Sequence, residues 1–393
     1  MIDCMSNTTV ERLIRDRSHT TFSFEDIERA ARNFPKKLYS DGIQNRAFTI
    51  WHGEDYLAMA HHPVVLTAIK KVLSAEGHPG TGDHSRLEYE VARLHGKESA
   101  LIFSSRSSAN DVALCMLGRA HPGTVFFSDE LNHESIAHGI HHSGAERIVF
   151  RHAHLPHLET LLASADPERA KVVVMESISS RGDVAPVAEV CALAARYGAM
   201  VYLDESRAVG AYGDQGGGVA SALGLSDRID LVVGSFEHGF GAVGSYIAGR
   251  AAFVDAVRVF ASPMIFTNSI SPAVFAGALA GVRHLRASNV ERELLTERAN
   301  YLKHLLRQAA IPTAPSDSHI VSITVGEGGN PRRIAGELFE RHAVSVCPEP
   351  ETLRVTATPR HTLGEVEHLV EALDEVWQRH ALPRAADLSP VVF

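Results

Sequence analysis

The chain has 393 residues, with 38 Lys or Arg against 47 Asp or Glu, which gives a formal net charge of −9, and 45% of its residues are hydrophobic. This length allows two or three domains around at least one large core. The acidic balance argues against nucleic acid or an anionic membrane as the main partner, because either needs a clustered excess of Lys and Arg. Small molecules are the predicted partners.

The sequence favours a soluble, cytoplasmic protein without disulfides or metal. No apolar run approaches the roughly 20 residues of a membrane-spanning helix, and the first residues are charged where a signal peptide is apolar. The histidine run at 152–157 belongs to no HExxH or zinc-type spacing. The four cysteines are far apart and lack a CxxC spacing: Cys4, Cys115, Cys191 and Cys347.

The sequence divides into three regions that differ in composition and hydrophobic pattern. Residues 1–55 are polar and helix-prone, as in FSFEDIERAARNF, and are predicted to be an N-terminal arm. Residues 56–285 alternate short apolar runs with amphipathic stretches, which predicts a large α/β domain with a mostly parallel central sheet. Residues 286–393 combine helical and strand-like segments into a predicted smaller C-terminal α+β domain. The strand-like runs of the large domain are ALIFSS (100–105), TVFFSDE (124–130), VVVMES (172–177), MVYLDES (200–206) and DLVVGS (230–235).

Polar side chains follow these strands, at the edge of a parallel sheet where ligands bind. They are Ser104, Ser105, Asp129, Glu176, Asp204, Glu205 and Ser235. The segment FSSRSSAND (103–111) opens a helix and suits a phosphate site or a plain N-cap, and both interpretations stay open. A buried Asp204 requires a cationic partner. GFGAVG (239–244) matches a dinucleotide fingerprint, but the strand-like SYIAG that follows is in the wrong context for it.

Taken together, these stretches resemble the α-oxoamine synthases, and most nearly their 5-aminolevulinate synthase branch. The resemblance runs over most of the chain, through EDYLAMAHHPVV, LEYEVARLHGKESALIFSS, SDELNHESIAHGI, DESRAVGAYGDQGGGVA, VGSFEHGFGAVGSYIAG, FTNSISPA, SHIVSITVG and LRVTATP. It implies the fold type I aminotransferase-like architecture, pyridoxal phosphate (PLP) as cofactor, an acyl-CoA cosubstrate and a homodimer.

The resemblance also implies roles for individual residues. Asp204 matches the aspartate that pairs with the pyridine nitrogen, and His133 matches the histidine that stacks on the ring. Ser235 and Thr267 match phosphate-binding hydroxyls, and Arg354 matches the arginine that holds an amino-acid carboxylate. The remaining expected contacts are Ser105, Ser107 and Arg207 toward the cofactor and Glu54 and Ser180 toward the substrate.

The chemical centre departs from the family pattern. Where the resemblance expects the lysine of the PLP Schiff base, this chain has Glu237 and His238, and imidazole forms no such imine. Arg207 replaces an expected histidine and Ser107 an expected aromatic residue. The loop after Glu76 is shorter than the family's. In the arm, Phe22 stands where an arginine would hold a succinyl carboxylate.

Three hypotheses follow. In the first, the protein transfers an acyl group from CoA to an amine or amino acid, with His238 as general base, Glu237 orienting it, and His133 beside them. In the second, PLP binds noncovalently and His238 moves the proton. In the third, the chain is a non-catalytic subunit of a lysine-bearing homologue. His238 also fits a plain core histidine. If Arg207 pairs with Asp204 or Glu205, protein fills the cofactor position and the second hypothesis fails.

Overall fold

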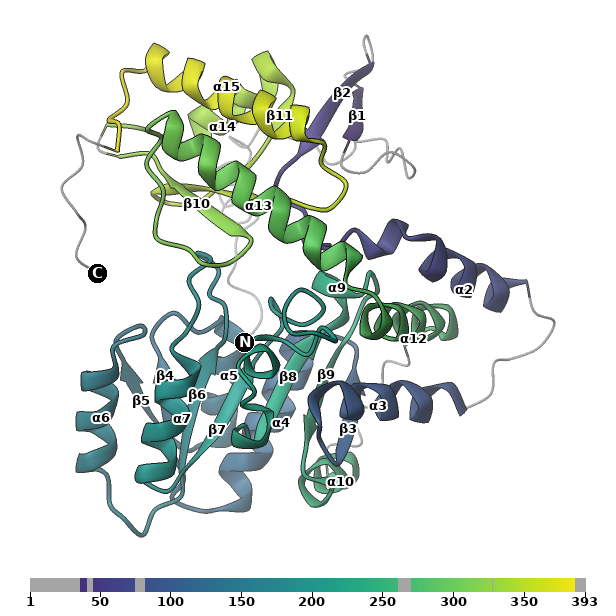
Figure 1. Ribbon diagram of the computed structural model, residues 1–393. Coiled ribbons are helices and arrows are strands. Elements are labelled where there is room, and N and C mark those ends of the chain that lie inside the picture. The colour runs from purple at the N-terminus through teal and green to yellow at the C-terminus, as the bar shows by residue number, and fades with distance from the viewer. Residues whose placement is uncertain (1–35, 41–44, 75–81, 261–269, 327, 386–393) are drawn as a thin grey trace, which may run out of the picture.

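The computed structural model describes residues 36–40, 45–74, 82–260, 270–326 and 328–385. Figure 1 shows two parts, with the teal main sheet in one and the green and yellow C-terminal elements in the other. Among the described helices, none is both long enough and apolar enough to cross a bilayer. Phe22, Thr267 and the helix-prone FSFEDIERAARNF segment lie outside the described residues.

The main sheet is mostly parallel, as the sequence predicts. In spatial order its strands are β3 (Ser99–Phe103), β9 (Ser245–Gly249), β8 (Leu231–Ser235), β7 (Ala199–Asp204), β6 (Lys171–Glu176), β4 (Val125–Asp129) and β5 (Glu146–Phe150). Only β9, the strand-like SYIAG, runs antiparallel to its neighbours. The five predicted strands all form. Strand β5 is not among the predicted strands, because it is an edge strand whose half-exposed residues lack a continuous apolar run.

Helices bury both faces of this sheet, which explains the Val-rich strands without alternation. On one face lie α4 (Arg106–Ala120), α5 (Glu134–Ser143) and α10 (Ala251–Phe260), and on the other α6 (Leu155–Ser164) and α7 (Val187–Arg196). Along β6, Val172 and Val174 pack into the first layer and Val173 into the second. Three more helices pack beside β3 and β9: α2 (Pro63–Leu73), α3 (Gly82–His95) and α12 (Pro272–Ala287).

The C-terminal part forms its own core. Its helices are α13 (Val290–Gln308), α14 (Pro331–His342) and α15 (Leu363–Arg379), and its strands are β10 (Ile320–Thr324), β11 (Val344–Ser345), β12 (Cys347–Pro348) and β13 (Thr352–Thr356). The protein also has two N-terminal strands, β1 (Lys36–Ser40) and β2 (Asn45–Ile50). Four short helices lie between the larger elements: η2 (Met59–His61), α8 (Val219–Ala222), η3 (Ser226–Arg228) and α9 (Phe236–Gly239).

The end of the predicted arm belongs to this C-terminal part. Strand β2 pairs in parallel with β11, and the purple β1 and β2 lie beside the green and yellow elements in Figure 1. Trp51 is fully buried in the same core and stacks on His361, with 3.8 Å between the ring centroids. A boundary at residue 55 therefore separates β2 and Trp51 from the core that buries them, because local composition does not reveal a partner strand almost 300 residues away.

Candidate active site

The predicted sheet edge brings two acidic residues together at the ends of neighbouring strands. Glu176 ends β6 and Asp204 ends β7, and the two residues are paired in the parallel register. Both side chains are buried. Because two adjacent buried carboxylates repel one another, the fold must supply positive charge at this point.

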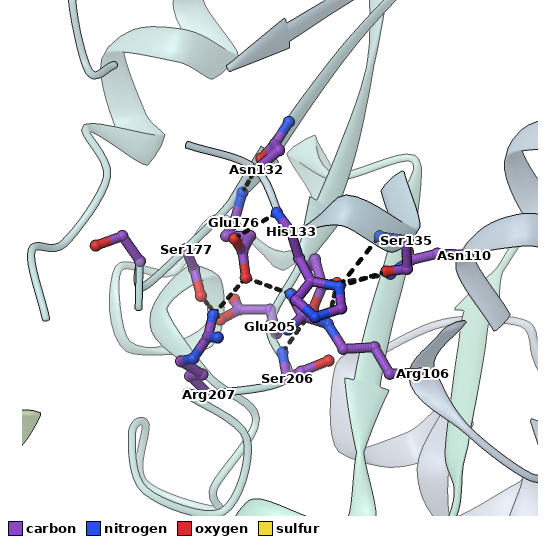
Figure 2. A network of polar contacts seen from close by, with 12 residues as sticks. Arg106, Asn110, Asn132, His133, Ser135, Glu176, Ser177, Glu205, Ser206 and Arg207 are labelled. Carbon is purple, nitrogen blue, oxygen red and sulfur yellow. Dashed lines mark hydrogen bonds and ion pairs between the residues drawn. The ribbon is translucent and has the colours of Figure 1, made fainter. Parts of the chain in front are cut away.

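Arg106 supplies that charge. It is the first residue of α4, whose N-cap is Ser105: the Ser105 hydroxyl accepts a hydrogen bond from the Ser108 amide at 3.2 Å. Arg106 Nε donates to Asp204 Oδ2 at 2.8 Å, and Arg106 Nη2 donates to Glu176 Oε1. Figure 2 shows Arg106 within this network, close to Glu176. The side chain of Arg106 is only 10% exposed, so the bridge is buried. Ser105 is the N-cap of α4, and a phosphate contact of this Ser-rich segment stays a prediction.

Both oxygens of Asp204 accept hydrogen bonds from protein groups. Asn110 Nδ2 donates to Oδ2 at 3.0 Å, and the Ser206 amide donates to Oδ1 at 2.9 Å. Burial raises the pKa of this carboxyl, but Arg106 and these hydrogen bonds outweigh burial and lower the pKa to about 2. Asp204 therefore has the predicted cationic partner and remains charged. Arg106 thus donates to the same carboxylate to which the resemblance assigns the pyridine nitrogen.

Arg207 has a different partner from the one expected. Its Nη1 donates to Glu176 Oε1 at 2.5 Å, and no ion pair joins it to Asp204 or Glu205 among the described residues. Glu205 instead accepts hydrogen bonds from the Ser177 hydroxyl and from two backbone amides of α8. The pairing of Arg207 with Asp204 or Glu205, which was the condition for rejecting noncovalent PLP, is therefore not met. Asp204 pairs with Arg106 instead.

One signal in the sequence pointed to Arg106. It directly follows a buried strand and a Ser-rich cap, where the first turn of a helix meets the sheet edge. An arginine there is surrounded by the polar residues that end the other strands. Its long side chain reaches any of several strand ends, so the sequence alone does not select Asp204 and Glu176 as its partners.

His133 lies beside this network. It caps α5, its Nδ1 is 2.7 Å from the Ser135 hydroxyl, and its backbone amide donates to Glu176 at 2.9 Å. Figure 2 shows its ring next to Arg106 and Glu176. Burial and the nearby Arg106 charge lower the pKa of His133, which favours the neutral imidazole.

His238 forms a second, neighbouring group. Its Nδ1 lies 3.1 Å from Glu54 Oε2 and 3.2 Å from the Glu54 carbonyl oxygen, and its ring stacks on Tyr56 with the centroids 5.0 Å apart. Both neighbours of Nδ1 are acceptors, so the network assigns the ring hydrogen to Nδ1. The Nε2 lone pair is then free, because Nε2 has no partner among the described residues. His238 is 8% exposed.

Glu237 does not orient His238. The side chain of Glu237 is exposed, whereas His238 is buried on the other side of the short helix α9. The hydroxyl of Ser235 caps this helix by accepting from the Glu237 amide at 3.1 Å. Glu54 takes the orienting position instead. The expectation for Glu237 is therefore wrong, because successive residues of a helical turn face in different directions.

Arg354, on β13, meets two carboxylates. Its Nη2 lies 3.5 Å from Glu54 Oε1, and its Nε lies 3.5 Å from Glu349 Oε1. Desolvation alone raises the pKa of Glu54, but the hydrogen bond from His238 and the charges of His238 and Arg354 outweigh it and lower the pKa to about 2. Glu54 is therefore a carboxylate that links Arg354 to His238.

The two remaining predicted residues among those described are Ser107 and Ser180. Ser107 is exposed on the first turn of α4, and Ser180 is partly exposed in the loop after β6. Their contacts to cofactor or substrate remain predictions.

One histidine cluster has metal-like spacing. His62, His284 and Glu291 place one ligand atom each within 4.8 Å of the others. His62 Nδ1 accepts from the Val64 amide, which puts the ring hydrogen on Nε2, the atom that faces Glu291. His284 Nε2 lies 2.8 Å from the same carboxylate oxygen. Contacts of both imidazoles with Glu291 account for the close approach of these three side chains.

Comparison with known proteins identifies the family. The model of aminotransferase class I and II matches residues 52–373. A 5-aminolevulinate synthase of Rhizobium meliloti is 43% identical over 382 residues, covering 92% of this chain and 94% of that protein. 5-Aminolevulinate synthase 2 of Cereibacter sphaeroides is 44% identical, covering 89% and 91%.

Solved structures agree with this result. A structure of SPT with PLP internal aldimine has a TM-score of 0.85 at 26% identity, covering 95% of this chain and 98% of that chain. A Sphingomonas wittichii serine palmitoyltransferase at 24% identity shares the fold, with a TM-score of 0.85 and coverage of 96% and 98%. The chain therefore belongs to the aminotransferase class I and II family, with the fold type I architecture, and is a homologue of the 5-aminolevulinate synthases.

Proposed function

We propose that the protein is an acyl-CoA-dependent acyltransferase that N-acylates an amine or amino acid without a PLP Schiff base. The observation that carries the proposal is the Arg106 bridge between Asp204 and Glu176, at the position where the resemblance places the pyridine ring. The second support is His238, which stands where the resemblance expects the Schiff-base lysine and keeps Nε2 free.

The SPT structure differs from this chain in how its cofactor is held. The SPT structure is described with a PLP internal aldimine, a linkage that requires a primary amine of the protein. Imidazole offers none. Noncovalent PLP is the alternative, but its pyridine ring would have to compete with the buried guanidinium of Arg106 for Asp204. The Asp204–Arg106 pair therefore favours acyl transfer catalysed by protein side chains over catalysis by bound PLP.

The chemistry needs one base and balances without an oxidant. The nitrogen of a neutral amine attacks the thioester carbonyl carbon, and His238 Nε2 accepts the proton that the nitrogen loses. The new N–C bond stays, the C–S bond breaks, and the proton passes to the sulfur, so the products are an amide and free CoA thiol. Glu54 holds His238 through Nδ1 and stabilises the imidazolium that forms. Thioester aminolysis is intrinsically easy, so positioning supplies much of the remaining acceleration.

The test is a direct assay of thiol release. Purified protein is incubated with a panel of CoA thioesters and amines or amino acids, free thiol is followed, and acylated products are identified by mass spectrometry. His238→Gln is expected to lower turnover roughly 10²–10⁴-fold, the usual contribution of a general base. Glu237→Gln, at the exposed neighbour, is the matched control and should keep full turnover.

Two outcomes contradict the proposal. Thiol release that requires added PLP favours a noncovalent condensing enzyme of the 5-aminolevulinate synthase type. No turnover alone, with activity only in a complex with a lysine-bearing homologue, favours a non-catalytic subunit. The proposal includes a homodimer located in the cytoplasm. Size-exclusion chromatography with light scattering tests the dimeric state.

A further inference from the structure

One buried hydroxyl beside the proposed base lacks a hydrogen-bond partner. Tyr56 is only 1% exposed, and its hydroxyl has no partner among the described residues. Buried polar groups in proteins are nearly always hydrogen-bonded, because an unpaired group gives up its bonds to water and gains none in return. The Tyr56 hydroxyl is therefore free to donate a hydrogen bond to a substrate atom.

The ring that carries this hydroxyl is held against the base. It stacks on the ring of His238 with 5.0 Å between the centroids and an angle of 9° between the planes. The Tyr56 amide also donates to the His238 carbonyl oxygen at 2.8 Å. His319 contacts the same phenol edge-on, with 4.3 Å between the centroids. These contacts fix the orientation of the phenol, so a substrate that reaches His238 is also close to Tyr56.

Two further buried nitrogens close to Tyr56 are without partners. Arg207 Nε and His319 Nε2 accept or donate no hydrogen bond among the described residues, although both side chains belong to buried residues. Arg207 is already paired with Glu176 through Nη1, but its Nε–H can only donate and still requires an acceptor. The unpaired groups around the Tyr56 ring thus match a ligand that offers an oxygen rather than an apolar surface.

The charges around the hydroxyl favour an oxygen that becomes negative. Burial and the Glu54 carboxylate raise the pKa of Tyr56, so the phenol keeps its hydrogen and remains a donor. Three guanidiniums act on the same group in the opposite direction, since each of them lowers its pKa: Arg207, Arg354 and Arg106. A protonated donor that lies within the field of positive charges is the arrangement that stabilises an oxyanion in a transition state.

We propose that Tyr56 is a catalytic residue of acyl transfer, whose hydroxyl donates a hydrogen bond to the carbonyl oxygen of the thioester. The inference rests on the proposed N-acyltransferase function. As the amine nitrogen attacks the carbonyl carbon, the π electrons of the C=O bond move to the oxygen, which becomes negative. The Tyr56 hydroxyl stabilises this oxygen and keeps its own proton. When the C–S bond breaks, the C=O bond forms again, and the proton from the amine passes through His238 to the sulfur.

Tyr56→Phe removes only the hydroxyl and keeps the ring against His238. In the thiol-release assay this variant is expected to lower kcat about 10²–10³-fold, the usual effect of removing one oxyanion donor. KM should change little, because the bond strengthens only as the negative charge develops. Tyr197→Phe, which removes a hydroxyl that donates to Glu159 at 3.3 Å, is the matched control and should keep full turnover.

Thermal unfolding of the free protein gives a readout that is independent of turnover. Because the Tyr56 hydroxyl has no partner to lose, Tyr56→Phe should leave the unfolding midpoint unchanged or raise it. Tyr246→Phe is the control for a buried hydroxyl that has a partner, since its oxygen lies 2.9 Å from His95 Nε2. This control should unfold at a lower temperature, because the buried His95 nitrogen is left unpaired.

The outcomes distinguish this inference from the proposed function. A lower kcat in Tyr56→Phe with the unfolding midpoint retained supports the inference. Full turnover in Tyr56→Phe overturns it and leaves acyl transfer standing, and so does a loss of thermal stability equal to that of Tyr246→Phe, which would give the hydroxyl a structural role. No thiol release by the wild-type protein with any acceptor overturns the proposed function, and the inference with it.

Discussion

Arg106 Nε lies 2.8 Å from Asp204 Oδ2, so the first turn of α4 neutralises the carboxylate that ends β7. The same guanidinium reaches Glu176 at the end of β6. One side chain thus ties a helix to two strands of the sheet, at the point where the fold type I resemblance places a cofactor ring. The site is therefore a structural bridge, and it is also the feature on which the proposed PLP-independent function depends.

Removing this bridge should destabilise the protein strongly. Arg106→Met leaves the buried Asp204 without its cation and is expected to cost about 3–5 kcal/mol of unfolding free energy, the usual penalty for breaking a buried ion pair on one side. Urea unfolding followed by circular dichroism measures it. Arg196→Met, which breaks the exposed pair with Glu159, should cost about 0–1 kcal/mol. An equal loss of unfolding free energy in the two variants would show that the Arg106 bridge stabilises the protein no more than an exposed ion pair does.

Restoring a primary amine should not by itself restore covalent PLP binding. His238→Lys supplies the amine, but Arg106 still occupies Asp204, so we expect no borohydride-stable pyridoxyl label by mass spectrometry. The double variant His238→Lys with Arg106→Gly frees Asp204 and should be labelled. Arg106→Gly alone is the control and should remain unlabelled. Labelling of the His238→Lys single variant would mean that Arg106 is easily displaced from the ring position.

His152 should make stability fall at alkaline pH. Burial alone lowers its pKa, but hydrogen bonds and ion pairs to Asp129 and Asp183 outweigh burial and raise it to about 10. Because this folded-state pKa lies above the unfolded value of about 6.5, the stabilisation is complete below pH 6.5 and is lost as pH rises toward 10.

The measurement is the urea midpoint as a function of pH for wild type and His152→Gln. The variant should be less stable near neutral pH, and its midpoint should vary less over the alkaline window. His142→Gln, which removes an exposed pair with Asp111, is the matched control and should follow wild type. Parallel curves for wild type and His152→Gln would contradict the ion pairs as the cause.

Trp51 should behave as a core residue of the C-terminal part. It is fully buried among residues of α13, α14 and α15, so Trp51→Ala is expected to cost about 3–5 kcal/mol. Leu73→Ala, at an exposed position on α2, should change stability by less than about 0.5 kcal/mol. Chemical denaturation of both variants checks this prediction. A negligible loss for Trp51→Ala would favour the N-terminal arm up to residue 55 that the composition predicts.

The sequence by itself determined the sheet and much of the helical pattern. Val-rich runs such as 172–177 and 230–235 predicted β6 and β8, because burial on both faces of a parallel sheet demands continuous apolar residues. The sequence also required a cation for Asp204, since a buried carboxylate without one is too costly. These inferences succeed because each depends on the chemistry of a short stretch of chain.

Only the tertiary structure decided which residues meet. In the folded chain, Asp204 pairs with Arg106 and not with Arg207. Similarly, His238 contacts Glu54 and not its sequence neighbour Glu237. It also joined β2 to β11 across most of the chain. Such pairings depend on strand register, helix direction and side-chain length. Register and direction are set only when distant segments pack together, so the local sequence pattern does not predict which residues pair.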